Sequence, residues 1–164
     1  MSTEDTGATL EGELALTAVE TVDTTFLETL IGYNARRTAL VAIESFLRVL
    51  EPLRLKPVEF SVLSLIEHNP GITQRQLCAA LNILPPNLVG LIQRQERRGF
   101  IEKRPHPRDG RASGLYTTDE GRSFVARAEE LVAALEARLV ARLSPSEQRT
   151  LLQLLQRVYR SPSV

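Results

Sequence analysis

The fold of this chain is decided by residues 72–121, which read ITQRQLCAALNILPPNLVGLIQRQERRGFIEKRPHPRDGRASGLYTTDEG. Thr73 to Gln76 fits a capping box, in which two side chains satisfy free backbone amides at a helix start. Asn82 predicts a left-handed stop for this helix, Pro85-Pro86 opens a second one, and Gly99 ends it. A turn-rich segment follows directly. The order predicts a helix-turn-helix followed by a β wing.

The wing is predicted from two short runs of residues that favour strands. Phe100 to Lys103 and Ser113 to Thr117 can pair around a tip formed by Pro105 to Ala112. The fold class is therefore mainly α with a small β wing.

Longer helices are predicted on both sides of this unit. Apolar residues at helical spacing predict one helix from Phe26 to Leu50, and Pro52 stops it. The next helix starts near Pro57 and ends before the breaker cluster Asn69-Pro70-Gly71. After the wing, a long amphipathic helix begins at Asp119.

The last helix begins with the capping box Ser144 to Glu147. The terminal helices carry more apolar surface than a small domain can cover, which predicts a dimer formed by N- and C-terminal helices. We divide the chain into an acidic and flexible tail (1–22), a dimerisation helix (23–56), a winged helix-turn-helix (57–118) and C-terminal dimerisation helices (119–164).

Charge is distributed unevenly, although the formal net charge is zero. The first 35 residues hold seven acidic side chains and no basic one. Residues 70–111 hold eight basic side chains against three acidic ones. A solvated basic face is one explanation, but clustering on one supersecondary unit favours a polyanionic partner.

Composition restricts the other classes of function. Among the 164 residues no run of about 18 apolar residues predicts a membrane span, and the polar N-terminus does not resemble a secretory signal. A single cysteine, Cys78, favours a cytoplasmic protein, and we interpret it as a small buried hydrophobe rather than a redox sensor. His68 and His106 have no neighbours at metal-ligand spacing, so neither a metal nor another cofactor is predicted. We also find no pattern typical of an enzyme.

The second helix of the motif has the residues that reading a DNA major groove requires. Asn87 can make a bidentate contact to adenine, and Gly90 lets the backbone approach the groove. Gln74 and Arg75 lie at a helix N-terminus, where free amides attract phosphate. An arginine at the wing tip suits a narrow minor groove. The predicted DNA contacts are Gln74, Arg75, Pro85, Pro86, Asn87, Gly90, Gln93, Arg94, Arg98, Arg108, Asp109 and Arg111.

From Phe26 to Tyr159 the chain resembles the MarR family of winged-helix transcriptional regulators. The most specific motifs are Leu77-x-x-x-Leu81-x-Ile83, the Pro85–Phe100 helix ending in Glu96-Arg97-Arg98-Gly99, Asp109-x-Arg111-Ala112 and Thr118-x-x-Gly121. The resemblance implies a homodimer that binds palindromic operator DNA as a repressor, with Asp109 and Arg111 as the signature pair of the wing. It also implies that a small ligand releases the DNA.

Several positions depart from the family's usual pattern. Leu84 replaces the serine or threonine that usually precedes the recognition helix, and Val89-Gly90 replaces polar residues in its middle. Gln95 stands where a leucine is expected, and Thr117 replaces a strand leucine.

An effector site is predicted where the first two helices could line a pocket. Arg36 and Arg37 could hold a carboxylate or phosphate, and Tyr33 and Phe60 could stack on an aromatic ring. The expected ligand is an aromatic acid, a phenol or an acyl thioester. The alternative is a dimer-interface face with surface arginines.

Two functions follow from these observations. The first is a ligand-released, DNA-binding repressor. The second is a winged-helix module that binds another protein, for which an apolar patch in place of the basic helix and wing would be typical.

Overall fold

The structure is a computed structural model that describes residues 22–106 and 109–160, with backbone only for residues 106 and 109–112. The chain divides into two compact units, residues 1–37 and 38–164. The predicted mainly α fold with a small β wing is confirmed. The predicted tail falls almost entirely outside the described residues.

The described part of the first unit holds α1 (Thr25–Glu28) and the start of α2 (Ile31–Leu50). The sequence predicted one uninterrupted helix here, and that prediction is wrong at Thr29 and Leu30. The Thr29 hydroxyl donates to the carbonyl of Phe26 (2.7 Å). The Asn34 amide donates to the carbonyls of Glu28 (2.7 Å) and Leu30 (2.9 Å). In a continuous helix the Glu28 carbonyl would accept from the Gly32 amide; here the Asn34 side chain satisfies it, so the helix can break.

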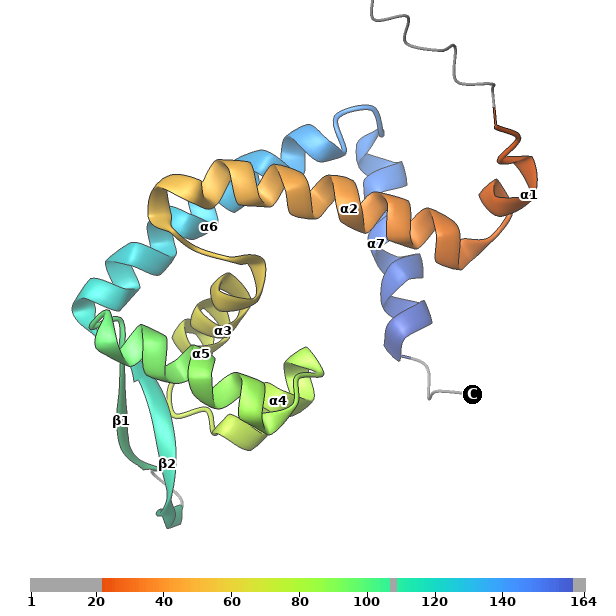
Figure 1. Ribbon diagram of the computed structural model, residues 1–164. Helices are drawn as coiled ribbons and strands as arrows, with labels where there is room; N and C mark the ends of the chain where they lie inside the picture. Colours follow the sequence, from red (N-terminus) through yellow and green to blue (C-terminus); the bar gives the residue numbers. More distant parts are fainter. Residues whose placement is uncertain (1–21, 107–108, 161–164) are drawn as a thin grey trace, which may run out of the picture. The chain divides into compact units, whose positions relative to one another are not determined.

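The second unit contains the end of α2 and the remaining elements, shown in Figure 1. They are the 3₁₀ helix η1 (Glu51–Leu53), α3 (Pro57–His68), α4 (Gln74–Leu81), α5 (Pro85–Arg97), β1 (Ile101–His106), β2 (Asp109–Thr117), α6 (Asp119–Leu139) and α7 (Pro145–Arg160). No helix among the described residues combines the length and hydropathy needed to cross a bilayer.

One hydrophobic core joins α3, α4, α5, the strands and the first half of α6. Its fully buried side chains include Val62, Ile66, Leu77, Leu88, Ile92, Leu115 and Ala128. Burying each large aliphatic side chain stabilises the fold by about 1.5–3 kcal/mol. The short helices α4 and α5 are therefore stabilised mainly by packing against this core.

Two polar residues stand at positions where the sequence departs from the family pattern. Gln95 is fully buried on α5, and neither of its side-chain polar atoms has a hydrogen-bond partner among the described residues. Thr117 is buried at the end of β2, and its hydroxyl donates to the Glu67 carboxylate on α3. A buried polar group costs free energy unless it is paired, so Thr117 is accommodated and Gln95 is not.

The predicted helix boundaries are confirmed where capping residues mark them. Thr73 accepts from the Gln76 amide (3.3 Å), and its own amide donates to the Gln76 side chain (2.8 Å). Asn82 ends α4 with φ of 50°, in the left-handed region. At the start of α7 the Ser144 hydroxyl and backbone amide donate to Glu147, and these bonds hold the pKa of Glu147 below its usual range.

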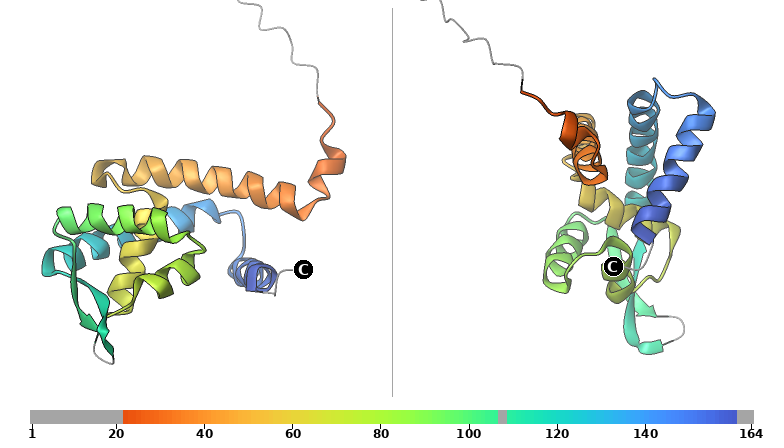
Figure 2. Two further views of the ribbon diagram at one scale, coloured as in Figure 1. Left: turned by 60° about the horizontal axis from the view of Figure 1, so that its bottom comes forward. Right: turned by 90° about the vertical axis from the view of Figure 1, so that its right-hand side faces the viewer.

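The antiparallel hairpin of β1 and β2 is longer than predicted. Its register pairs Ile101 with Thr117, and a shift follows Pro105. Both views of Figure 2 show the two strands extending away from α3, α4 and α5. An isolated bridge between Ile72 and Leu115 ties the base of the hairpin to the segment before α4.

The start of α6 packs directly on the turn that ends α5. The Thr118 hydroxyl accepts from the amide of Gly121 (3.0 Å) and donates to the carbonyl of Gly99 (2.6 Å). A β-carbon on Gly121 would lie 1.9 Å from the carbonyl oxygen of Phe100. Backbone atoms on both sides fix this contact, so only glycine fits.

We therefore expect Gly121→Ala to lower the free energy of unfolding by at least about 2 kcal/mol, because the clash forces α6 away from Phe100. Urea unfolding followed by circular dichroism measures the change. Gly90→Ala is the matched control. A β-carbon there has as its nearest neighbour only Arg94 Nη1, at 3.7 Å, and alanine favours the helix. Equal stability of the two variants would contradict this packing.

Candidate nucleic-acid interface

The first turn of α4 presents one of the predicted contact pairs. Gln74 is half-buried and Arg75 is exposed. Within the part of the chain that the structure describes, no acidic side chain pairs with Arg75. Its charge therefore remains available beside the free amides of a helix N-terminus, an arrangement that attracts phosphate.

Helix α5 separates cleanly into an inner and an outer face. Leu88, Leu91, Ile92 and Gln95 are buried. The predicted contacts Pro85, Pro86, Asn87 and Gln93 are all exposed, and Gly90 is half-exposed. Residues three and four apart lie together on a helix, so Pro86, Gly90, Gln93 and Arg97 share one side. The sequence-predicted residues of α5 thus gather on the face that the core leaves free.

Arg94 has a partner that the sequence did not predict. Its Nε donates to Glu59 Oε1 (3.0 Å), and Glu59 is buried while Arg94 is about half exposed. The second carboxylate oxygen of Glu59 accepts from the backbone amide of Lys56 (3.1 Å). Glu59 therefore fixes the guanidinium of Arg94 against α3. Its contact with DNA stays a prediction.

Arg98 is also held within the protein. Its guanidinium donates to the carbonyls of Leu53 (3.0 Å) and Arg54 (3.4 Å). The same group lies over the rings of Phe100 (4.7 Å) and Phe124 (5.1 Å), which stack with centroids 4.1 Å apart. The DNA contact predicted for Arg98 stays a prediction, and the geometry gives this side chain an internal role.

Arg97, next to it, has the opposite character. It is exposed at the end of α5, and none of the described acidic residues pairs with it. The sequence analysis selected Arg98 and not Arg97 as a DNA contact, and only long-range contacts distinguish the two. Arg75 and Arg97 are the cations of α4 and α5 whose charge is not offset within the described residues.

The wing carries further charge. Lys103 pairs with Glu96 (2.9 Å), and Arg104 pairs with Glu102 and lies 5.1 Å from the centre of the Tyr116 ring. The predicted wing-tip contacts Arg108, Asp109 and Arg111 fall outside the described side chains, and they stay predictions.

The predicted effector residues occupy two elements in different units. Tyr33, Arg36 and Arg37 lie on α2 in the first unit. Phe60 lies on α3 in the second unit, with its ring edge-on to Phe46 at 5.5 Å. The predicted pocket combines both units and stays a prediction.

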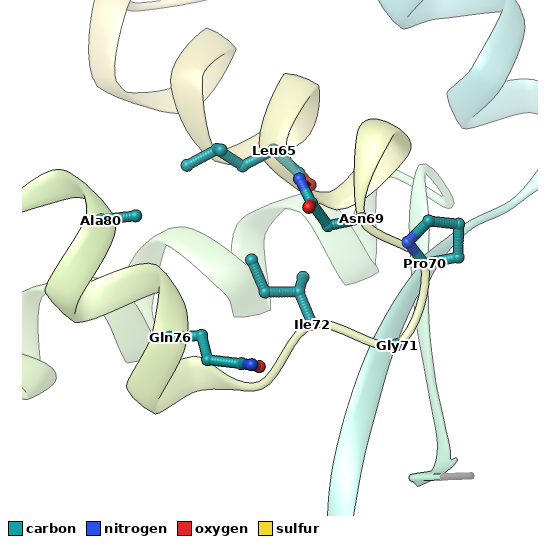
Figure 3. Close-up of a pocket in the computed structure, with 7 residues that line it drawn as sticks. All are labelled: Leu65, Asn69, Pro70, Gly71, Ile72, Gln76 and Ala80. Atoms are coloured by element: carbon teal, nitrogen blue, oxygen red, sulfur yellow. Dashed lines mark hydrogen bonds between the residues drawn. The ribbon is translucent and has the colours of Figure 1, made fainter.

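A pocket of about 450 Å³ lies between the end of α3 and α4 (Figure 3). Its lining residues are Leu65, Asn69, Pro70, Gly71, Ile72, Gln76 and Ala80, none of which was predicted as an effector contact. The Asn69 amide and the Gln76 side chain are engaged in local bonds to Leu65 and Thr73. One polar atom of each of these side chains is therefore already bonded within the protein.

Cys78 and His68, two further candidates, are both engaged with neighbouring residues. Cys78 is partly buried against the core, as the sequence predicted for a small hydrophobe. His68 accompanies Ser64 in bonding one oxygen of Glu129, at 2.9 and 2.7 Å. The described residues contain no cluster of three His, Cys, Asp or Glu side chains that could hold a metal ion.

Comparison with known proteins decides the family. A model of the MarR family matches residues 55–112. A putative transcriptional regulatory protein for the hcr operon of Thauera aromatica is 31% identical over 134 residues, which cover 81% of each protein. The chain belongs to the MarR family. The predicted assignment is confirmed, and the MarR family is one of transcriptional regulators.

Two solved structures extend the MarR comparison. The transcriptional repressor CouR bound to a 23-mer DNA duplex has a TM-score of 0.79 and 37% identity, covering 85% of this chain and 99% of that one. CouR bound to p-coumaroyl-CoA has a TM-score of 0.76 and 35% identity, covering 86% and 99%.

The different surroundings of Arg97 and Arg98 predict different effects on stability. We expect Arg98→Ala to lower the free energy of unfolding by about 1–3 kcal/mol, because two charged hydrogen bonds and the ring contacts are lost. Arg97→Ala, the matched control, should change it by less than about 0.5 kcal/mol. Urea unfolding at one protein concentration compares them. Similar values for the two variants would show that Arg98 is not held as described.

Proposed function

We propose that this protein is a dimeric transcriptional repressor that binds a palindromic operator and leaves it when an aromatic acyl thioester binds. The observation that carries this proposal is the pair of CouR structures, one with DNA and one with p-coumaroyl-CoA. Both resemble this chain over 85% or more of its length at 35% identity or above.

DNA binding is supported by the chemistry of α4 and α5. Arg75 and Arg97 keep their charge available, and Asn87 and Gln93 offer exposed amides between them. Cations that meet phosphates supply affinity, and amides that meet base edges supply sequence preference. Both kinds of group lie on these two helices, as a helix-turn-helix requires.

Dimerisation is supported by apolar surface that the second unit leaves uncovered. Helix α7 buries none of its residues. Its exposed apolar side chains are Leu151, Leu152, Leu154, Leu155, Val158 and Tyr159, between 38% and 68% exposed. Monomers rarely expose a contiguous apolar face of this kind. A second copy of the chain would cover it and would place two recognition helices about 34–36 Å apart.

Release by a thioester is supported by two arginines on α2. Arg36 and Arg37 are exposed, and none of the described acidic residues pairs with them. Guanidinium groups bind phosphates in a bidentate manner, which suits the coenzyme part of an acyl-CoA. Tyr33, on the same helix, supplies a ring for the aromatic part. The proposal makes the protein a ligand-responsive binding protein rather than an enzyme, and it places the protein with its DNA in the cytoplasm.

A titration on a duplex selected from random sequence tests this function. Fluorescence anisotropy should give a log–log slope of affinity against salt near about −5, if about six phosphates are contacted. p-Coumaroyl-CoA should weaken binding by roughly 5- to 150-fold, and free coenzyme A should have a much smaller effect. A flat salt response would instead favour a protein-binding winged helix.

The control for the ligand is the double variant Arg36→Gln/Arg37→Gln. It should keep the salt slope and lose most of the response to p-coumaroyl-CoA. An unchanged response would remove these two arginines from the effector site and leave DNA binding intact.

The dimer is tested at α7. Leu152→Glu places a charge on a side chain that is 59% exposed in a single chain, and the dimer would bury it. We expect dissociation into monomers and a loss of operator affinity of at least tenfold, since one half-site binds weakly alone. Analytical ultracentrifugation measures the mass. Gln153→Glu, an exposed neighbour on the same helix, should remain dimeric. A dimeric Leu152→Glu variant would exclude α7 from the interface.

A further inference from the structure

The first turns of α5 have an apolar outer surface that its core packing does not explain. Leu84 is 70% exposed and Val89 is 39% exposed, and Pro85 and Pro86 between them are exposed too. We call Pro85, Pro86 and Val89 the apolar patch. The side chains that fasten α5 to the core are on its other face.

Leu84, Val89 and Gly90 work against the local stability of the helix. Leu84 occupies the N-cap position and provides no side-chain bond, whereas serine, threonine or asparagine would satisfy a free amide. Val89 is β-branched and Gly90 lacks a side chain, and both disfavour a helix interior. Packing does not require Gly90, because a β-carbon there would have only the end of Arg94 as a neighbour, at 3.7 Å. Departures from local rules on one exposed face are typical of a functional surface.

The patch is continuous with groups that suit DNA. Asn87 lies in the same turn, Gln93 follows Val89 by one turn, and Arg97 follows Gln93 by another. An apolar protein partner would more naturally meet a surface without these amides and the free cation. The neighbours of the patch therefore favour an occupant within a DNA groove.

The major groove offers one apolar group on its base edges, the C5-methyl of thymine. We propose that Val89 recognises a thymine methyl group in each half of the operator, with Pro85 and Pro86 enclosing it. This inference rests on the proposed function and adds a chemical preference to it. Contact with a methyl group needs no hydrogen bond, so the apolar side chain of Val89 can make it. Family members more often have a polar residue at this position.

The test uses the full-length protein and a duplex obtained by selection from random sequence. Each thymine pair, one in each half-site, is replaced in turn by deoxyuridine, which keeps base pairing and removes only the methyl group. At one thymine position, each methyl group removed should weaken binding about fourfold, the value expected for one buried methyl group. The Val89→Ala variant should bind the thymine duplex more weakly and should be insensitive to deoxyuridine at that position alone.

Val58→Ala is the matched control, since Val58 is 36% exposed on α3 and carries the same side chain. It should keep the full deoxyuridine profile of the parent. Thermal unfolding should confirm that both variants are folded, because both valines are surface residues.

Each outcome decides something different. If the parent binds the duplex and no deoxyuridine weakens it, the inference is overturned and the proposed function stands. If Val89→Ala keeps the parent's affinity and profile, the patch faces something other than DNA, and the inference fails. A Val89→Ala variant that loses affinity but stays sensitive to deoxyuridine would show that another residue contacts the thymine methyl group. That result also overturns the inference. If no duplex is bound above background, the proposed function itself fails.

Discussion

The guanidinium of Arg98 lies between elements that are far apart in the sequence. On one side it donates to the carbonyls of Leu53 and Arg54, which follow the end of α2. On the other it covers the stacked rings of Phe100 and Phe124, the second of which belongs to α6. The Gly121 backbone closes the same joint against Phe100. The orientation of α5 therefore depends on this joint. The joint fixes the C-terminal end of the helix, and the core packs against the rest of it.

In the proposed function, this joint would connect a bound ligand to α5. The segment that follows α2 meets α6 at this joint, and α2 and α6 belong to the proposed effector and dimer regions. Close-packed interiors do not deform continuously, so a rotation of either helix passes to α5 as a shift of the whole helix. The Arg94–Glu59 pair attaches α5 a second time, at a residue four positions before Arg98. A ligand on α2 would not need to touch α5. A coupling free energy of about 1–3 kcal/mol between ligand binding and DNA binding equals the net contribution of a few hydrogen bonds.

The sequence predicted what is decided locally. Thr73, Asn82 and Ser144 mark helix ends because their side chains or backbone act within four residues. It did not predict the interruption before α2, where Asn34 reaches back six residues to Glu28. It also selected Arg98 rather than Arg97 as a DNA contact, since the carbonyl partners that hold Arg98 lie 44 and 45 residues away. Sequence pattern and propensity cannot distinguish two arginines that differ only in their long-range partners. The buried carboxylate of Glu59, which fixes Arg94, is beyond them for the same reason.

The recognition helix is weak by its own composition. Leu84 does not cap it, Gly90 lowers its helix propensity, and buried Gln95 leaves two polar atoms without a described partner, at a cost of about 1–3 kcal/mol. Thr117 shows that a polar replacement in this core can be paired, so the cost at Gln95 is not inevitable. A helix with low stability of its own takes its position from the elements around it. In the proposed function, such a helix would lower the free energy that a ligand has to supply to release the DNA.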